Sequence, residues 1–544
     1  MNRKTLLFIF LFASISLHKV AAQKSIFADS TKLVIDGQLA PFNTLLPGDT
    51  ILLGKGIRPF IIFKNIIGDV HQSIIIINQN GCVEINSDHY FGISIRKSKY
   101  LKLSGNGDTN HLYGIRIFNR IGSGLSIGDF TSDFEIENIE IGYSQYSGIT
   151  AKTEPFCGFD RNSFIQENSH IHHCYVHHTG TEGMYIGSTF YAGQTVQCTS
   201  GPMIVMPALL RNVNVHHNKV EYTGWDGIQV SSAVNASIHH NLIKYDSQQL
   251  ADWQMTGITL GEGSTGQIFN NEIMNGEGMG IYTKALGDVL VYNNKIIRPG
   301  MKNNLPSGKY GIYIDGKASL PGMHFHVLNN LIINPKFEGI RYINGLGGSK
   351  NGIINNVIVQ ESYLIDKDKA VFINTNAMQV LQSNNYTSTD LSSVRFKNTL
   401  ADDYTTEEGS ILIDGGSSLE HLKIEYDFND QARLQGNSID IGPYESSYNR
   451  NNIYDNSTSE YAYPNPVSLI NKTTISFNNP DEGWIEFVLV SQNGSELKTI
   501  DRNYFEKGVQ IKIINANVLL PGLNYVVIRK RMSSTLLRIS VFKD

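Results

Sequence analysis

The chain has 544 residues, of which 41% are hydrophobic and 50 are glycine, so it can build a large apolar core and more than one domain. Its formal net charge is −5 and its pI is near 6.4, which gives no reason to expect nucleic acid or an anionic membrane as a partner. Beyond the N-terminal segment no run approaches 18 apolar residues, so we expect no transmembrane segment in the mature chain.

Residues 1–22 have the pattern of a secretory signal peptide. Arg3 and Lys4 precede an apolar run from Leu6 to Leu17, and small residues stand before Gln23. A run of about twelve residues is too short to cross a bilayer as a helix, which favours a cleaved signal over an anchor. We therefore expect an exported protein.

Short apolar runs and turn residues alternate from Ala28 to Leu103, as at the start of a solenoid. Strands led by glycine follow at Gly114–Ile117 and Gly148–Ala151. Two long insertions, 152–169 and 187–210, come after successive strands of this kind. We expect both insertions to stand together at one edge of a groove.

The four cysteines allow at most two disulfides. Cys157 and Cys198 lie in the two insertions, and the sequence leaves open whether they form a bridge or remain thiols. Cys82 and Cys174 fall in strand-like segments and are predicted to be buried thiols rather than metal ligands.

Two short sequence motifs alternate between Ile171 and Ile358. One has an aliphatic residue, an Asn three places on (Cys174 in the first copy) and a second aliphatic residue; the other is a Gly followed by alternating apolar and polar residues. Successive Asn positions lie about 23 residues apart, as from Asn218 to Asn241, with insertions in some copies. The period of two indicates short strands, and a unit of such strands must stack on its neighbours to bury its apolar edge.

The repeated Asn suits a tight turn between strands, because Asn tolerates the left-handed conformation and its amide can bond to the Asn one coil away. The pattern resembles the right-handed parallel β-helix family of pectate-lyase-like proteins over most of the chain. That resemblance implies an all-β solenoid in which the Gly-led strands form a first sheet. It also implies that the ladder Asn lies between the second and third strands, and that long loops frame a groove over the first sheet.

Doubled histidines occur in three copies of the repeat, at His172–His173, His216–His217 and His239–His240. A metal site would need three or four ligands that converge on one ion. The second histidine of each pair is replaced by Asn in later copies, which favours a structural polar column. We therefore predict no metal site.

The segment Leu412–Gly416, followed by acidic residues from Asp427 to Glu445, resembles the closing segment of secreted β-helix proteins. Its carboxylates are suited either to calcium or to a hydrogen-bonded cap over the open end of the solenoid, and we favour the cap. The β-helix domain is thus predicted to span 23–445. Residues 446–460, rich in Ser, Asn, Tyr and Asp, are predicted to be a linker.

Residues 461–544 carry short alternating strands and turn signals that predict a small antiparallel β-sandwich. With its start at Tyr463-Pro464-Asn465-Pro466, this region resembles the C-terminal sorting domain of the type IX secretion system of Bacteroidetes-type bacteria. The resemblance implies the type IX machinery as a partner, export through the periplasm and outer membrane, and a secreted or cell-surface location.

The outward-pointing residues of the Gly-led strands are expected to form the floor of the groove. They are Arg116, Thr150, Tyr185, Gln229, Thr259, Tyr282, Tyr313 and Arg341. Trp225, Trp253 and Tyr310 lie in loops that lead to this floor. Because aromatic faces above a polar trough suit sugar rings, we predict a polysaccharide or surface glycan as partner, bound by Trp225, Trp253, Gln229, Tyr282 and Tyr313.

Two catalytic chemistries are open. Glu182 and Asp226, each directly before a strand Gly, are suited to act as the carboxylate pair of a hydrolase, although a carboxylate before Gly is also common turn chemistry. A lyase needs a base, for which we consider Tyr185 or Lys284. It also needs a group such as Arg341 to neutralise the carboxylate of a uronate. Calcium, held by acidic residues, is a possible cofactor if the protein is a lyase. The alternative is a non-catalytic glycan-binding or adhesive surface protein.

Overall fold

In the computed structural model of the protein, the described residues are 23–306, 308–345, 351–361, 372–376, 378, 380–448, 461–463, 465, 467–468, 470–479, 481–490, 496–530 and 534–542. The predicted signal peptide and most of the predicted linker lie outside this set. Within the set, no helix is long and apolar enough to cross a membrane. The chain forms two compact units, one up to Lys219 and one from Val220 onward.

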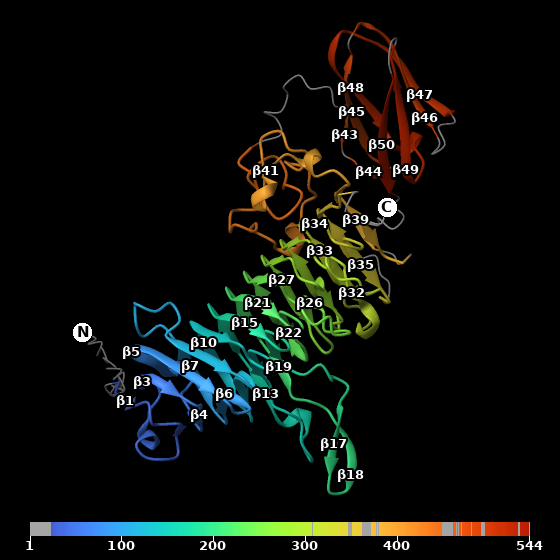
Figure 1. The fold of residues 1–544 in the computed structure, drawn as a ribbon. Coiled ribbons are helices and arrows are strands. Elements are labelled where there is room, and N and C mark those ends of the chain that lie inside the picture. The colour runs from blue at the N-terminus through green and yellow to red at the C-terminus, as the bar shows by residue number, and fades with distance from the viewer. Residues whose placement is uncertain are drawn as a thin grey trace, which may run out of the picture. The chain divides into compact units, whose positions relative to one another are not determined.

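In the first unit, short parallel strands stack in register (Figure 1). Its first sheet consists of β2 (Val34–Asp36), β4 (Ile61–Lys64), β6 (Phe91–Arg96), β9 (Ser123–Gly128), β12 (Ile149–Ala151) and β16 (Met184–Ile186). The second strands of the coils are β1 (Ser25–Ala28), β3 (Thr50–Arg58), β5 (Ile74–Ser87), β7 (Lys99–Ser104), β10 (Ser132–Glu137), β14 (Ser169–His172) and β20 (Asn214–His216). The third strands are β8 (Ile115–Asn119), β11 (Ile139–Gly142) and β15 (Tyr175–Thr179), and β5 is long enough to pair with both β7 and β8.

The second unit continues the same pattern. Its first sheet consists of β22 (Ile228–Val230), β26 (Thr256–Leu260), β29 (Met279–Thr283), β32 (Ile312–Asp315), β35 (Ile340–Ile343) and β38 (Ile373–Asn374). The second strands are β24 (Ala236–His239), β27 (Gly266–Phe269), β30 (Val289–Tyr292), β33 (Phe325–Leu328), β36 (Gly352–Ile354) and β39 (Leu381–Ser383). The third strands are β21 (Lys219–Thr223), β25 (Leu242–Lys244), β28 (Glu272–Met274), β31 (Lys295–Ile297), β34 (Leu331–Ile333), β37 (Val357–Val359) and β40 (Tyr386–Ser388).

Most first-sheet strands begin with a glycine that packs closely against the third strand of the same coil. A Cβ added at Gly257 would lie 2.5 Å from Cγ2 of Ile273, the buried residue of the third strand in the same coil. The same contact recurs between Gly280 and Ile296. Any larger residue would push the first and third strands apart, so the glycine is required by close packing.

The predicted amide ladder is confirmed. In the second unit, the Oδ1 atom of Asn294 accepts hydrogen bonds from the backbone N and the Nδ2 of Asn271, at 3.1 and 3.0 Å. Asn330 does the same for Asn294. The left-handed conformation, however, belongs to the residue before the ladder position, such as Asn293 with φ 53°. Our prediction on this point was wrong, because the turn places the ladder Asn itself in the buried coil interior.

The left-handed position before each ladder residue also explains the doubled histidines. His173 has φ 53° and occupies the left-handed position that Asn fills in later coils. His172 points outward from β14 and stacks on His216 of the next coil, with ring centroids 4.8 Å apart. Both histidines therefore belong to columns that repeat along the solenoid, as the sequence predicted.

The predicted place of Arg116 was wrong. Strand β8 pairs with β11 among the third strands, and Arg116 lies opposite Glu140, with an Nε to Oε2 distance of 3.1 Å. The first-sheet strand of this coil is β6, which presents Ser94. Gly114 is needed because a Cβ there would lie 2.3 Å from the amide of Asn78, so this glycine does not mark a first-sheet strand.

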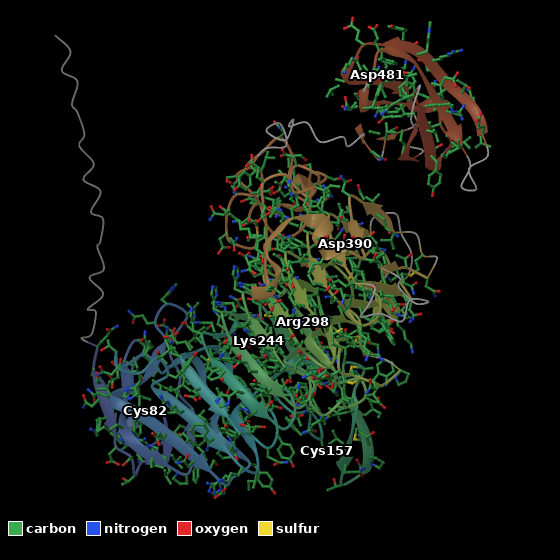
Figure 2. All side chains as sticks on the ribbon, turned by 45° about the horizontal axis from the view of Figure 1, so that its top comes forward. Cys82, Cys157, Lys244, Arg298, Asp390 and Asp481 are labelled. Atoms are coloured by element: carbon green, nitrogen blue, oxygen red, sulfur yellow. A yellow bond between two sulfur atoms is a disulfide. The ribbon has the colours of Figure 1, made fainter. Side chains whose placement is uncertain are left out.

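The two long insertions of the first unit are joined by a disulfide between Cys157 and Cys198, of which Cys157 is labelled in Figure 2. This settles the alternative that the sequence left open and confirms that the insertions stand together. The second insertion forms an antiparallel hairpin of β17 (Gln194–Cys198) and β18 (Gly201–Val205). The first carries η2 (Arg161–Ser163) and β13 (Ile165–Glu167), which pairs with β19 (Leu209–Arg211). Cys174 is a buried thiol, as predicted, and Cys82 is a half-buried one.

The segment predicted to cap the open end of the solenoid instead runs along its side. The left-handed asparagines donate to its backbone coil by coil, Asn293 to Tyr426 at 2.9 Å and Asn355 to Ser417 at 2.9 Å. Arg298, labelled in Figure 2, forms two 2.7 Å hydrogen bonds with Asp402 and so ties the preceding part of this segment to β31. We call residues 391–445 the side segment. Its elements are η5 (Leu391–Val394), β41 (Phe396–Asn398), η6 (Thr399–Ala401), β42 (Asp403–Thr406) and η7 (Glu420–Leu422).

The acidic residues of the side segment accept backbone hydrogen bonds, as expected of a hydrogen-bonded structure. Asp427 accepts from the backbone N of Asn429, Gln431 and Glu445, each at 2.8 Å. Asp440 accepts from the backbone N of Asp414 at 2.7 Å. These carboxylates are therefore committed to holding the segment's own turns.

The C-terminal region forms two small sheets that pack face to face. One contains β43 (Tyr461–Tyr463), β45 (Lys472–Asn479) and β48 (Gly508–Asn515), and the other β44 (Val467–Ser468), β50 (Ser534–Phe542), β49 (Gly522–Arg529), β46 (Gly483–Val490) and β47 (Glu496–Phe505). Phe477 of the first sheet meets Phe487 of the second in a shared apolar core. The predicted all-β fold, a parallel β-helix followed by a small sandwich, is confirmed.

Candidate functional site

The first sheet of the second unit presents a column of outward side chains, which we call the floor. Strand register places each member directly beside the next one along the column. The members are Gln229, Thr259, Tyr282, Tyr313, Arg341 and Asn374. The sequence predicted the first five, because alternation within a strand and stacking between strands fix them together.

Aromatic rings and a guanidinium group gather at one part of the floor. Tyr313 lies 5.2 Å from Tyr282 and 5.2 Å from Tyr310, measured between ring centroids. Arg341 lies over the rings of Tyr310 and Tyr313, at 5.2 and 5.8 Å from their centroids. Its Nη1 also contacts Oε1 of Glu338 at 2.8 Å. We call these five residues the tyrosine–arginine cluster.

Exposure differs within this cluster. Tyr282 and Tyr313 are each 9% exposed, whereas Tyr310 and Arg341 are half-buried. A ligand would therefore meet the edges of the first two rings and more of the other two side chains. Burial, followed by the negative charge of Asp315, raises the pKa of both Tyr282 and Tyr313, so both hydroxyls stay protonated and can donate.

Carboxylates hold the charged side chains of the floor in place. Glu338 accepts a second hydrogen bond, from Asn374 Nδ2 at 3.1 Å. Lys284, which follows β29, forms an ion pair with Glu262, which follows β26. Asp315, at the end of β32, accepts from Asn344 Nδ2 at 3.0 Å. Sequence reasoning missed Glu262 and Asn374, and only the pairing of neighbouring strands reveals them.

Asp226, predicted to be catalytic, is 1% exposed. Its Oδ1 accepts from the backbone N of Thr256 and its Oδ2 from the hydroxyl of Thr259, both at 3.0 Å. It thus joins neighbouring coils just before the floor. Of the predicted binding tryptophans, Trp225 is half-buried, whereas Trp253 is 74% exposed.

Glu182 and Tyr185 belong to the first unit. Glu182 is 4% exposed and accepts from the hydroxyl of Ser147 at 3.1 Å. Tyr185 points outward from β16, with its hydroxyl 3.1 Å from that of Thr189 and the ammonium of Lys152 over its ring at 4.2 Å. The predicted site residues are therefore divided between the units, and the structure brings Tyr282, Tyr313 and Arg341 together.

Among the described residues, Glu135, Glu137 and His172 of the first unit offer ligand atoms within 4.8 Å of one another. The ammonium of Lys102, however, lies 2.6 Å from Glu135 and 2.8 Å from Glu137. A side-chain cation thus already occupies the place between the carboxylates. These donors fit a metal ion only if Lys102 is displaced.

Comparison with known proteins bears on the fold. A family model for the right handed beta helix region matches residues 208–358. The chain contains a right-handed parallel β-helix. No curated protein matches the sequence.

Several solved structures resemble this β-helix protein distantly. GH136 lacto-N-biosidase from Eubacterium ramulus has 13% identity and a TM-score of 0.45, over 67% of this chain and 68% of that chain. Pectate lyase Pel9A has 11% identity and a TM-score of 0.43, over 78% and 97%. Alginate lyase from Paenibacillus sp. str. FPU-7 has 13% identity and a TM-score of 0.38, over 56% and 93%. At this level of likeness nothing about activity follows for this chain.

Proposed function

We propose that this protein acts on an extended polysaccharide that lies along the floor of the second unit. The tyrosine–arginine cluster is the observation that carries the proposal. Its tyrosine edges offer apolar contact to sugar rings, while Arg341, Glu338 and Asn374 offer hydrogen-bond partners to hydroxyl groups. Because neighbouring coils are about 4.8 Å apart, the floor repeats along one direction, which suits a polymer better than a compact ligand.

Cleavage of this polymer is the finer part of the proposal. Hydrolysis requires a carboxylate pair. Asp226 of the second unit remains a candidate for one member of the pair, and it must give up its present hydrogen bonds to act. Elimination would use Lys284 as base and Arg341 as the neutralising cation. Non-catalytic glycan binding is the second candidate function, favoured by the engagement of Lys284 and Arg341 in ion pairs.

The test is to incubate the full chain with neutral and uronate-containing polysaccharides, with and without calcium, and to analyse soluble products by mass spectrometry. Products lighter by the elements of water indicate elimination, and full-mass products indicate hydrolysis. Binding without products indicates the non-catalytic function. Failure to bind any polysaccharide would overturn the proposal.

A substitution at Tyr310 tests the cluster directly. We expect Tyr310→Ala to weaken glycan binding by about 10- to 100-fold, because a half-buried ring of this kind is a typical anchor in a binding site. Tyr310→Phe keeps the ring and should retain most of the affinity. Calorimetric titration measures both, with Tyr90→Ala, at a tyrosine that is 82% exposed in the first unit, as the control. Equal affinities for all variants would exclude this cluster as the binding site.

We also propose that residues 461–544 direct export by a type IX secretion system and that the protein is secreted or displayed at the cell surface. The Tyr463-Pro464-Asn465-Pro466 start and the two-sheet sandwich support this. In a bacterium that carries this system, the chain without residues 461–544 should remain in the periplasm while the full chain leaves it. Export of both forms to the same extent would refute the assignment.

A further inference from the structure

The charges on the floor indicate whether the polysaccharide is charged or uncharged. This inference rests on the proposed function. Among the described floor residues and those two places further along the same strands, the cations are Arg341 and Lys284. Arg341 is paired with Glu338 at 2.8 Å, and Lys284 is paired with Glu262. Each cation is thus already neutralised by a carboxylate of the protein.

Among these described residues, the remaining charge is negative. Asp315 ends β32 beside Tyr313, and its Oδ1 accepts hydrogen bonds from an amide and a backbone N–H, neither of which carries a charge. Because Asp315 stands two places after Tyr313 on the same strand, its side chain lies on the face of the floor, and after burial its charge also raises the pKa of Tyr282 and Tyr313. Among the described residues of the floor, no unpaired cation would offset this charge for a carboxylate on a bound sugar.

We propose that the polysaccharide is uncharged, a neutral polymer of hexoses or pentoses bound through hydroxyl groups and ring faces. This choice also bears on the reaction. Elimination removes a proton from the carbon beside a uronate carboxylate, and a neutral sugar lacks that acidified proton. Cleavage of a neutral polymer is therefore hydrolysis, in which water gives its hydroxyl to the anomeric carbon and a proton ends on the leaving oxygen.

The direct test compares the affinities of the full chain for neutral and anionic polymers by affinity electrophoresis. A β-glucan and a galactan serve as neutral probes, and polygalacturonate and alginate as anionic ones. We expect at least tenfold tighter binding to one of the neutral polymers. Equal or tighter binding to a uronate polymer would overturn this inference and leave the proposed function standing, whereas binding to neither class would overturn both.

Charge-removing variants supply the second measurement. Glu338→Gln and Glu262→Gln keep a side chain of the same shape and release Arg341 and Lys284 from their partners. We expect each to gain about tenfold in affinity for polygalacturonate at low salt, a gain that disappears at high salt because the new attraction is screened. Glu408→Gln, at an exposed position of the side segment, makes the same change in net charge and should leave this affinity unchanged. No gain in the first two variants would contradict the inference.

Discussion

Replacing Asn294 by Leu is expected to lower the free energy of unfolding by about 3–5 kcal/mol. The Nδ2 of Asn294 donates to the carbonyl oxygen of Ile268 at 2.8 Å and to Oδ1 of Asn330 at 3.0 Å. Its Oδ1 accepts from the backbone N of Asn271 at 3.1 Å. Leu has a similar size but no polar group, so it would leave several buried donors and acceptors unsatisfied, each costing about 1–3 kcal/mol.

Urea unfolding followed by far-UV circular dichroism measures this loss. Asn106→Leu, at an exposed asparagine of the first unit, is the matched control and should change the free energy of unfolding by less than about 0.5 kcal/mol. A loss below about 1 kcal/mol for Asn294→Leu would show that the amide ladder contributes little to the stability of the β-helix.

Raising the pH from about 5 to above 8 is expected to destabilise the side segment. Burial, opposed in part by Arg433, raises the pKa of Glu445 from 4.5 to about 8, and burial raises that of Asp440 from 3.8 to about 6. The folded state therefore keeps protons that the unfolded chain releases near its ordinary pKa. The contribution of both groups to stability is fully present below about pH 4, falls as the pH rises through this window and levels off above about 8, with a total loss of several kcal/mol.

Chemical unfolding at a series of pH values tests this prediction. Glu445→Gln removes the proton exchange at the more strongly shifted group and should flatten most of the slope between pH 5 and 8. The exposed Glu408→Gln serves as the control and should keep the slope of the parent protein. A stability that rises across this range would show that Glu445 is held charged by Arg433 instead.

The repeat alone was sufficient to predict the coils, the amide ladder and most of the floor. A period of two fixes which residues point outward, and stacking of equivalent strands fixes which outward residues become neighbours. Tyr282, Tyr313 and Arg341 meet for this reason. The two insertions also lie together because they leave successive coils. Whether Cys157 and Cys198 form a disulfide between them was decided only by the structure.

The course of the side segment depended on contacts far apart in the sequence. The sequence did indicate that some segment covers the third strands. Leu331–Ile333 and Val357–Val359 are apolar at every position, which is typical of strands buried on both faces. Only the tertiary structure identified the cover as residues 391–445, which pack apolar side chains on these strands and accept hydrogen bonds through backbone carbonyl groups that carry no sequence signature.

By itself, then, the sequence determined the all-β solenoid, its ladder and the column of floor residues, because strand alternation and coil stacking are local rules that repeat. Only the tertiary structure decided which sheet holds Arg116, where the side segment runs and which charges on the floor are paired. Those features depend on strand register and on long-range ion pairs such as Lys284 with Glu262. Lys284 and Glu262 lie on neighbouring coils, so no pattern within one coil can reveal that contact.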